Sequence, residues 1–341
     1  MIIVLKPEHT AEDIRTVESK VRELGYEPHT IQGEVRTVVA AVGDETDKQS
    51  LDVLLILPMI ESILPVQKRY KLVSKETHPE PVVVRVRDIE IGGGLFHVVG
   101  GPCSVESESQ LLGTARDVKA AGATLLRGGA YKPRTSPYDF QGLGLGGLKI
   151  LEKARAETGL PIVTEVVREP DIDDVCSVAD ILQIGARNAM NYALLESVAD
   201  TGKPILLKRG LSATIMEWLL AAEYIVKRGN RNVILCERGI RTFEQATRNT
   251  LDLSAVAIAK KETCLPVFVD PSHAAGRWDL VIELSKASAA VGADGLLIEV
   301  HHDPEHALSD GGQQLKPSDF ARLMKDIEPF VQAAGKSLAR C

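Results

Sequence analysis

The sequence predicts an α/β protein, a (β/α)8 TIM barrel preceded by a small ferredoxin-like βαββαβ domain. Two observations predict this fold. Strand and helix patterns follow the order β-α-β-β-α-β near the start of the chain. Further along, short apolar runs alternate with amphipathic segments over about 250 residues, as in a barrel. We place the small domain at residues 1–72, a linker at 73–81, and the barrel with an N-terminal hairpin at 82–341.

The elements of the small domain follow from local periodicity. Residues 2–5 form an apolar run typical of a strand, and Ile14, Val17 and Val21 recur at helical spacing within 12–24. The other expected elements are strands at 28–32 and 36–42, a helix at 47–57, and a strand at 61–66. The polar, proline-containing segment 74–81 is typical of a linker.

The barrel pattern begins after an alternating hairpin at 82–91 that ends in three consecutive glycines. Apolar runs follow at 96–100, 124–127, 161–165, 181–185, 204–208, 232–237, 266–270 and 295–300. Amphipathic stretches such as 216–226 and 280–291 lie between them. A doubly wound open sheet is the competing topology, but no Gly-x-Gly-x-x-Gly turn directly follows an early strand, which favours the barrel.

Composition excludes several classes of protein. Only 4% of the residues are aromatic and the net charge is -7, which argues against a nucleic-acid partner. The longest apolar run, 53–59, is too short to span a membrane, and the chain starts without a leader-like segment. The five cysteines have no paired spacing, which fits a reducing compartment. We therefore expect a cytoplasmic enzyme.

Charged side chains follow the ends of the predicted barrel strands, where they would converge on one pocket. Seven are cationic, and such a cluster in a protein of net negative charge favours anionic ligands: Arg127, Lys132, Arg134, Arg187, Lys208, Arg209 and Arg238. The alternative is that these cations pair with barrel carboxylates such as Glu165 and Glu237. For Arg209 the two interpretations have equal weight.

A second group of strand-end residues has the chemistry of metal ligands. Cys103, His273, Glu299 and Asp310 follow strands that become neighbours when the barrel closes, and they suit a first-row divalent ion. Their spacing is too wide to be a local motif. Individually, Cys103 could be a buried apolar residue, His273 a helix cap and Asp310 a turn residue. We expect His301 and His302 to lie outside the first ligand set.

Seven segments resemble those of DAHP (3-deoxy-D-arabino-heptulosonate 7-phosphate) synthases. The resemblance runs from about residue 82 to the end of the chain, and the version of the family with a ferredoxin-like domain also covers residues 1 to about 70. The matching segments are Gly-Pro-Cys-Ser-Val-Glu at 101–106, 126–136, 184–188, 207–210, 236–239, Asp-Pro-Ser-His at 270–273, and 308–311.

The resemblance implies a role for each site residue. Cys103, His273, Glu299 and Asp310 fall on the family's metal ligands. Arg134 and Thr135 fall on the segment that holds erythrose 4-phosphate. In the related 3-deoxy-octulosonate 8-phosphate synthases this segment is of the Asn-Arg-Ser type, whereas this chain has Pro-Arg-Thr-Ser at 133–136. The positions that hold phosphoenolpyruvate are Arg127, Lys132, Arg187, Lys208 and Arg238.

The implied reaction joins phosphoenolpyruvate, erythrose 4-phosphate and water to give the seven-carbon product and phosphate, the first step of the shikimate pathway to aromatic amino acids. The ligand set tolerates Mn²⁺, Fe²⁺, Zn²⁺ or Co²⁺. The expected catalytic residues are Lys132, Cys103 and His273. Proton transfer falls to Lys132 or to a water at the metal, and the sequence does not decide between them.

The resemblance also implies that the small domain binds an aromatic amino acid as an allosteric inhibitor, with His29 and Thr30 as candidate contacts, and that the enzyme is a homotetramer. A purely stabilising or oligomerising role is the alternative for this domain. For the barrel, the alternatives are a 3-deoxy-octulosonate 8-phosphate synthase-like enzyme, a synthase for an N-acyl mannosamine, or an inactive amino-acid-sensing barrel. The last is least favoured, because every expected ligand and cation is present.

Overall fold

A computed structural model describes residues 1–33, 36–43, 49–64, 69–134 and 136–340 of the chain. Contacts divide it into two compact units, Met1–Arg69 and Tyr70–Cys341. This division falls ahead of the boundary expected at residue 72. Each unit has its own buried core, as domains do.

The small unit is a four-stranded antiparallel sheet with the order β2-β3-β1-β4. Helix α1 (Ala11–Glu23) buries Ile14, Val17 and Val21 against one face, and Thr10 begins the helix with a capping box to Asp13. The expected βαββ order and the ferredoxin-like fold are confirmed. The strands are β1 (Ile2–Leu5), β2 (Glu27–Gln32), β3 (Thr37–Val42) and β4 (Ile60–Leu64).

The second helix of the small unit differs from the prediction. In place of the helix expected at 47–57, the structure has a short 3-10 helix, η1 (Leu51–Ile56), and part of the expected range lies outside the described residues. Its buried residues, Leu51 and Leu54, are three positions apart, which suits the three-residue repeat of a 3-10 helix. Pro58 then disfavours helical geometry at Leu57, which is extended.

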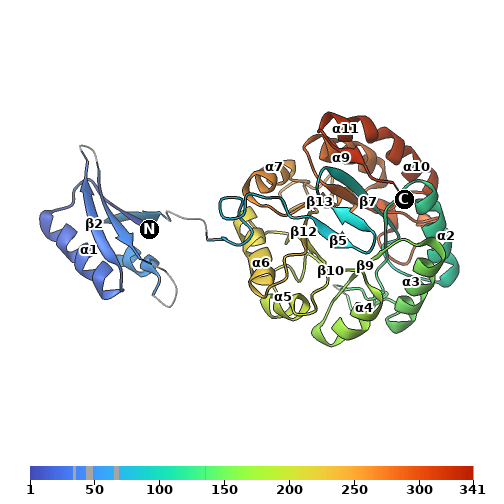
Figure 1. Ribbon diagram of the computed structural model, residues 1–341, viewed down its shortest axis with the longest axis horizontal. Helices are drawn as coiled ribbons and strands as arrows, with labels where there is room; N and C mark the ends of the chain where they lie inside the picture. The colour runs from blue at the N-terminus through green and yellow to red at the C-terminus, as the bar shows by residue number, and fades with distance from the viewer. Residues whose placement is uncertain (34–35, 44–48, 65–68, 135, 341) are drawn as a thin grey trace. The chain divides into compact units, whose positions relative to one another are not determined.

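The larger unit is a closed barrel of parallel strands. Successive strands pair in chain order, and β14 pairs with β7 to close the ring (Figure 1). The eight predicted runs are its strands: β7 (Leu95–Gly101), β8 (Leu125–Arg127), β9 (Ile162–Glu165), β10 (Ile181–Ile184), β11 (Ile205–Lys208), β12 (Val233–Glu237), β13 (Val267–Val269) and β14 (Gly295–Glu299). The barrel predicted from the sequence is confirmed.

Helices surround the barrel and bury their apolar sides against it (Figure 1). A short strand, β15 (Ser337–Leu338), adds to β7 near the C-terminus. The helices are α2 (Glu108–Ala120), α3 (Leu145–Thr158), α4 (Ile172–Val178), α5 (Tyr192–Ala199), α6 (Ile215–Lys227), α7 (Leu253–Glu262), α8 (Pro271–Ala275), α9 (Val281–Ala290), α10 (Pro317–Asp326) and α11 (Glu328–Ala333). None of the described helices has the length and apolar character needed to cross a membrane.

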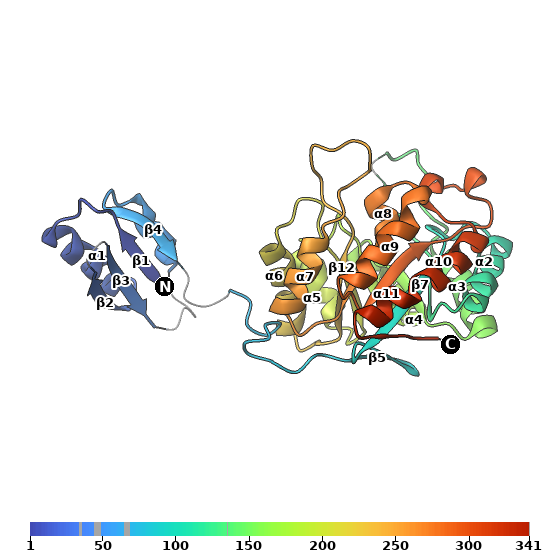
Figure 2. The same ribbon diagram turned by 90° about the horizontal axis from the view of Figure 1, so that it is seen from above.

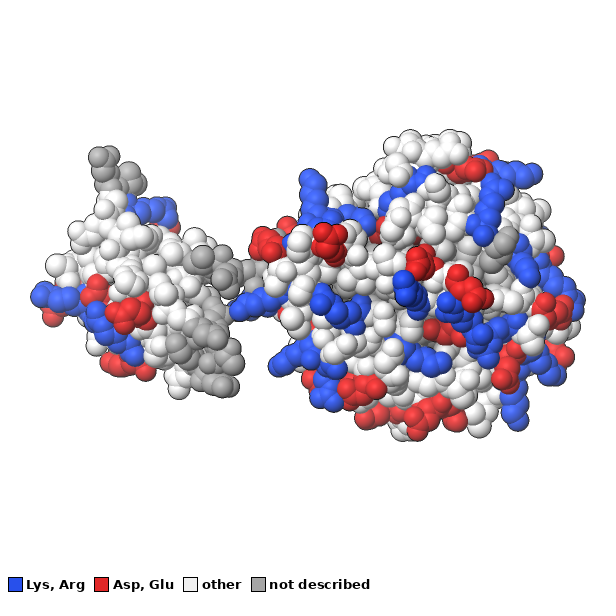
Figure 3. Space-filling model, in the orientation of Figure 1, with Lys and Arg blue, Asp and Glu red and all other residues white. Residues whose placement is uncertain are grey.

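The predicted hairpin forms β5 (Val84–Val86) and β6 (Ile89–Ile91), and it covers one end of the barrel. Its apolar side chains join the cluster of inward-facing barrel residues, which includes Leu206 and Phe268. Figure 2 shows β5 at this end and α8 at the opposite end, where the strands end. Seen from the hairpin end, the barrel surface in Figure 3 mixes both signs of charge. A binding site is therefore expected at the other end.

The segment expected as a linker lies along the barrel. Lys75 N donates to Glu262 O at 3.0 Å, and Val82 N donates to Cys264 O at 2.8 Å. Just before it, the backbone amides of Lys71, Leu72 and Val73 donate to the Glu223 carboxylate. These contacts explain why the larger unit begins at Tyr70.

Candidate active site

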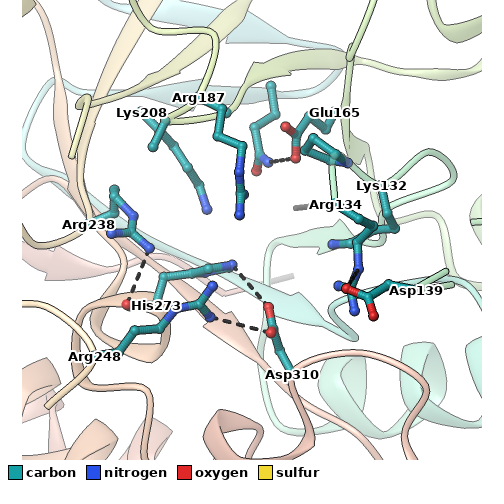
Figure 4. Close-up of a pocket in the computed structure, with 14 residues that line it drawn as sticks. Lys132, Arg134, Asp139, Glu165, Arg187, Lys208, Arg238, Arg248, His273 and Asp310 are labelled. Atoms are coloured by element: carbon teal, nitrogen blue, oxygen red, sulfur yellow. Dashed lines mark hydrogen bonds and ion pairs between the residues drawn. The ribbon is translucent and has the colours of Figure 1, made fainter. Parts of the chain in front are cut away.

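A polar pocket of about 230 Å³ lies at the carboxyl ends of the barrel strands. Figure 4 shows the side chains of Lys132, Arg187, Lys208 and Arg238 converging on it. All four are among the cations expected to bind anions. The complete lining is Lys132, Pro133, Arg134, Asp139, Glu165, Gln183, Gly185, Ala186, Arg187, Lys208, Arg238, Arg248, His273 and Asp310.

Strand ends and short loops position these cations. Lys208 is the last residue of β11, and its Nζ lies 2.5 Å from Asp270 Oδ2. Arg238 directly follows β12, and its Nη2 donates to the His273 carbonyl at 3.3 Å. Arg134 is more exposed than Lys208 and Arg238, and its Nη1 donates to Ser309 Oγ at 3.1 Å. The pocket therefore has an inner and an outer group of positive charges.

Two of the expected cations do not line the pocket. Arg127 is buried, and its Nη2 lies 3.1 Å from Glu299 Oε1. Arg209 is also buried, and its Nη1 lies 2.9 Å from carboxylate oxygens of both Glu237 and Asp252. For Arg209 the pairing interpretation therefore holds. The Arg127 pair places a guanidinium directly beside a candidate metal ligand.

The four candidate metal ligands lie close together. One oxygen, Asp310 Oδ2, is 3.5 Å from Cys103 Sγ and 3.9 Å from His273 Nε2. His273 Nε2 is also 3.5 Å from Glu299 Oε1. The ligand atoms of Cys103, Glu299 and Asp310 all lie within 4.8 Å of one another. Side chains from four separate parts of the chain thus meet at one point.

The donor set fits a divalent cation. Glu299 Oε1 is buried and accepts no hydrogen bond from a described residue, although Arg127 Nη2 lies 3.1 Å and His273 Nε2 lies 3.5 Å away. Burial raises the pKa of the Cys103 thiol to about 12, and Glu299 adds to the rise. The thiol is therefore protonated until a bound cation displaces the proton. Thiolate, imidazole and carboxylate together suit a first-row metal.

His273 is oriented by its position on α8. Asp270 caps this short helix by accepting from His273 N, and Asp270 Oδ2 also lies 2.7 Å from the ring nitrogen Nδ1. Burial lowers the pKa of His273. With Nδ1 toward Asp270, Nε2 is the ring nitrogen that faces Glu299 and Asp310. Burial opposes ionisation of Asp270, but His273 and Lys208 hold its pKa well below the ordinary value. A carboxylate behind a ligating histidine is a common support at metal sites.

Lys132 lies between the pocket cations and the candidate metal ligands. Its Nζ is 3.0 Å from Cys103 Sγ and 3.1 Å from the Cys103 carbonyl. Burial works to lower the pKa of Lys132, but the nearby acidic groups, Cys103, Glu165 and Glu299, outweigh it and raise the pKa. A Cβ at Gly129 would come within 2.9 Å of Lys132 Cδ, so the absence of a side chain there leaves room for the lysine.

Several residues of the pocket were not assigned roles from the sequence. Arg248 belongs to the long loop between β12 and α7, which has no periodic pattern. Gln183 Nε2 donates to Glu165 Oε2 at 3.1 Å on the pocket wall. A Cβ at Gly185 would overlap the Glu165 carboxylate. For Glu165, its position at the end of β9 is the feature of the sequence that could have identified it as a pocket residue.

The other residues named from the sequence either fall outside the described residues or do not line the pocket. Thr135 is outside the described residues. His29 and Thr30 are on β2 of the small unit, and Thr30 Oγ1 donates to Glu18 Oε1 of α1. Because neighbouring strand residues point to opposite faces, exposed His29 is directed away from that helix. His301 is buried, with Nε2 3.4 Å from Glu106 Oε2, and it does not line the pocket.

Comparison with known proteins gives matches along nearly the whole chain. Residues 71–333 match the DAHP synthetase I family, and residues 1–68 match the DAHP synthase ferredoxin-like domain. The phospho-2-dehydro-3-deoxyheptonate aldolase of Thermotoga maritima is 51% identical over 340 residues, covering 98% of this chain and 99% of that protein. A 2-dehydro-3-deoxyphosphooctonate aldolase of Acidithiobacillus ferrooxidans is 33% identical, covering 70% of this chain and 91% of that protein.

Solved structures agree. A crystal structure of phospho-2-dehydro-3-deoxyheptonate aldolase (DAHP synthase) from Thermotoga maritima matches with a TM-score of 0.94 at 50% identity, covering 99% of this chain and 98% of that one. A truncated form of the synthase from the same organism matches with a TM-score of 0.74 at 50% identity, covering 79% of this chain and 99% of that one.

The closed barrel and its polar pocket are those of a (β/α)8-barrel enzyme. More particularly, the chain belongs to the DAHP synthetase I family and has the activity of a DAHP synthase. Enzymes of this kind use phosphoenolpyruvate and erythrose 4-phosphate and depend in general on a metal ion.

Proposed function

We propose that the pocket at the barrel mouth is where this chain condenses phosphoenolpyruvate with erythrose 4-phosphate, beside a divalent cation held by Cys103, His273, Glu299 and Asp310. The observation that carries the proposal is that a cationic pocket and a cluster of candidate metal ligands lie side by side. Cationic side chains line the pocket, and the cluster of Cys103, Glu299 and Asp310 lies at its edge.

The inner cations bind phosphoenolpyruvate in this scheme. Arg187, Lys208 and Arg238 approach the pocket from three successive strands, so they can contact a phosphate and a carboxylate at once. Buried Arg127 contributes its charge from behind Glu299. Two anionic substrates repel each other, and fixed positive charges reduce that repulsion before the carbon–carbon bond forms.

The metal ligands would hold the cation next to the reacting aldehyde. When bound, the cation supplies Lewis acidity, which polarises the aldehyde carbonyl toward attack. Mn²⁺, Fe²⁺, Zn²⁺ and Co²⁺ are all compatible with a thiolate, an imidazole and two carboxylates. Supporting the four-ligand set, His273 Nε2 approaches both Glu299 and Asp310.

Lys132 is the proposed proton donor. The methylene carbon of phosphoenolpyruvate attacks the aldehyde carbon, and the aldehyde oxygen takes up a proton from Lys132 Nζ. Water then adds to the oxocarbenium carbon that carries the phosphate ester, and the proton it releases returns to Lys132. The C–O bond to phosphate breaks as the ketone forms, and phosphate leaves with the electron pair and the hydroxyl proton. The raised pKa of Lys132 keeps the ammonium form available at neutral pH.

The outer cation Arg134 is the proposed contact for the sugar phosphate, with Thr135 beside it in the sequence. Arg134 lines the pocket and contacts Ser309, next to the candidate ligand Asp310. The position of Arg134 on the pocket lining supports a contact with the sugar phosphate. A synthase for a longer phosphosugar is the second candidate, because phosphooctonate aldolases match 70% of the chain.

An assay with defined substrates separates these candidates. Loss of phosphoenolpyruvate is followed with erythrose 4-phosphate or arabinose 5-phosphate, before and after chelation, and after each metal is added back. We expect turnover with erythrose 4-phosphate that is lost on chelation and restored by metal. Equal or faster turnover with arabinose 5-phosphate would reject the four-carbon assignment, and full activity after complete removal of metal would reject the cation site.

The other family features are also proposals for this chain. The ferredoxin-like domain supports regulation by an aromatic amino acid, with His29 and Thr30 as candidate contacts, and the family resemblance supports a homotetramer. The described cysteines are free thiols, which supports a cytoplasmic location.

A further inference from the structure

Each ligand carboxylate has one oxygen directed at the proposed metal position and a second oxygen held from outside. Asp310 Oδ2 faces Cys103 and His273, while Asp310 Oδ1 lies 3.3 Å from Arg248 Nη1. Glu299 Oε1 faces His273, while Glu299 Oε2 accepts a hydrogen bond of 2.6 Å from Gln313 Nε2. The outer oxygens thus have partners of their own.

The two outer partners are joined to each other. Arg248 Nη1 donates to Gln313 Oε1 at 3.0 Å, so one guanidinium nitrogen contacts both the amide and Asp310. This bond fixes the direction of the Gln313 amide, because its oxygen must face Arg248 and its nitrogen must face Glu299. Gln313 is only 2% exposed, so both of its polar atoms need partners.

Backbone structure holds both residues in place. Gln313 ends the short 3-10 helix η5 (Gly311–Gln313), which Asp310 begins in the left-handed conformation with φ of 50°. An aspartate in that conformation is uncommon and depends on its surroundings to remain there. The loop that carries Arg248 is bound to the end of α8, where Arg248 N donates to Ala275 O at 2.9 Å.

We propose that Gln313 and Arg248 act together as positioning residues that aim the inner oxygens of Glu299 and Asp310 at the metal. The inference rests on the proposed cation site and adds a residue pair outside the ligand set. Partners of this kind fix the orientation of metal ligands, and their loss typically weakens metal binding by about 10- to 100-fold.

The test uses Co²⁺ as the probe, because a cobalt–thiolate bond gives a charge-transfer absorption band that reports on Cys103. The metal-free full-length protein is titrated with Co²⁺ in competition with a chelator of known affinity. The variants are Gln313→Met, Arg248→Met, the double variant and Arg248→Lys. Arg241→Met is the matched control, because Arg241 is exposed in the same loop and does not line the pocket.

We expect each Met variant to bind Co²⁺ about 10- to 100-fold more weakly than the unchanged protein. The fold-loss of Co²⁺ affinity in the double variant should be much smaller than the product of the two single fold-losses, because the two side chains act in one chain of contacts. Arg248→Lys should recover part of the loss, and Arg241→Met should bind normally. Thermal unfolding of the metal-free variants reports whether they fold. If Gln313→Met does not, Arg248→Met, with its side chain 39% exposed, still provides the test.

Two results would overturn the inference. Co²⁺ affinities within about twofold of the unchanged protein would show that the pair does not orient the ligands. A raised KM for erythrose 4-phosphate in Arg248→Met, with unchanged Co²⁺ affinity, would make Arg248 a substrate contact instead. Failure of the underlying site has a different signature. In that case the unchanged protein with Co²⁺ shows no charge-transfer band, or it shows a band that remains in Cys103→Ser.

Discussion

At the scale of single residues, Lys132 is where the pocket and the metal ligands meet. Its ammonium contacts the Cys103 sulfur and carbonyl, and it also lines the pocket. No other described lysine contacts a proposed metal ligand while lining the pocket. A proton donor for the aldehyde oxygen has to be within reach of both groups.

Replacing Lys132 with Met tests this role. At saturating metal and phosphoenolpyruvate, we expect kcat to fall by about 10²- to 10⁴-fold, the usual contribution of a proton-transfer group. Binding of phosphoenolpyruvate should persist, because Arg187, Lys208 and Arg238 remain. Lys149→Met, at an exposed position of α3, is the control and should turn over normally. Near-normal turnover in Lys132→Met would exclude the lysine from catalysis.

Gly185 is a second test at this scale. An added Cβ would overlap the Glu165 carboxylate and shift the pocket wall beside Arg187, and a displacement of about 1 Å can cost about 10²-fold in rate. Gly185→Ala should therefore lower kcat/KM for phosphoenolpyruvate by about that factor. Gly146→Ala in α3 is the control, because its Cβ would meet only Leu143 Cβ at 4.0 Å. Equal kinetics of the two variants would show that the wall is not constrained at Gly185.

Residues at strand ends and in the segments that resemble the family could be predicted from the sequence, and residues on the remaining irregular loops could not. Lys208 ends a buried strand, so its position in the barrel follows once the strand is recognised. Arg248 and Gln313 lie in segments without periodicity, and only the folded structure brings them to Glu299 and Asp310. The position of Arg209 after β11 likewise did not reveal that its side chain is buried against Glu237 and Asp252.

At the scale of elements, the β5–β6 hairpin closes one end of the barrel through a buried histidine. His97, on β7, lies between the hairpin and the barrel strands. Its Nε2 is 2.9 Å from the Glu90 carbonyl, and its Nδ1 is 3.1 Å from Thr124 Oγ1. The side chain is 2% exposed, and burial lowers its pKa. The hairpin and the strands were predictable from alternation and buried runs. The 3-10 helix η1 was not, because its apolar spacing also fits an α-helix.

The lowered pKa of His97 predicts acid sensitivity of the barrel. Below about pH 6.5 the unfolded chain binds a proton at His97 that the folded chain does not. The free energy of unfolding therefore decreases as the pH is lowered, until the pKa of His97 in the folded chain is reached. The loss is at most about 1.4 kcal/mol per pH unit. In His97→Gln, the decrease in Tm between about pH 7.5 and about pH 5.5 should be smaller than in the unchanged protein.

His306→Gln is the matched control, because the His306 side chain is 82% exposed. It should keep the acid sensitivity of the unchanged protein. An unchanged Tm decrease in His97→Gln would show that the buried histidine does not link pH to stability.

At the scale of the whole molecule, the two units have separate cores, and the active-site residues all belong to the larger one. A truncated relative that covers 79% of this chain has a solved structure. The contacts of Tyr70–Val73 with Glu223 and Glu262 belong to the barrel unit, so a truncation should begin at Tyr70. The sequence predicted the two units but not this anchoring, which depends on side chains far along the chain.

Deletion of residues 1–69 should leave turnover and metal dependence in place, because every proposed catalytic and ligand residue remains. If the small domain is regulatory, inhibition by tyrosine or phenylalanine should disappear with it. Initial rates with and without each amino acid, for the full chain and the truncated chain, provide the comparison. Unchanged inhibition after truncation would move the regulatory site to the barrel.

The proposed reaction depends most on four residues, distant in sequence, that hold one cation at the barrel mouth. Crystals grown with Mn²⁺, Co²⁺ or Zn²⁺ and measured at the absorption edge of that metal test this directly. We predict one strong anomalous peak, in coordination contact with Cys103 Sγ, His273 Nε2, Glu299 Oε1 and Asp310 Oδ2. A metal peak elsewhere in the barrel, or one that neither the thiolate nor the imidazole touches, would contradict the proposed site.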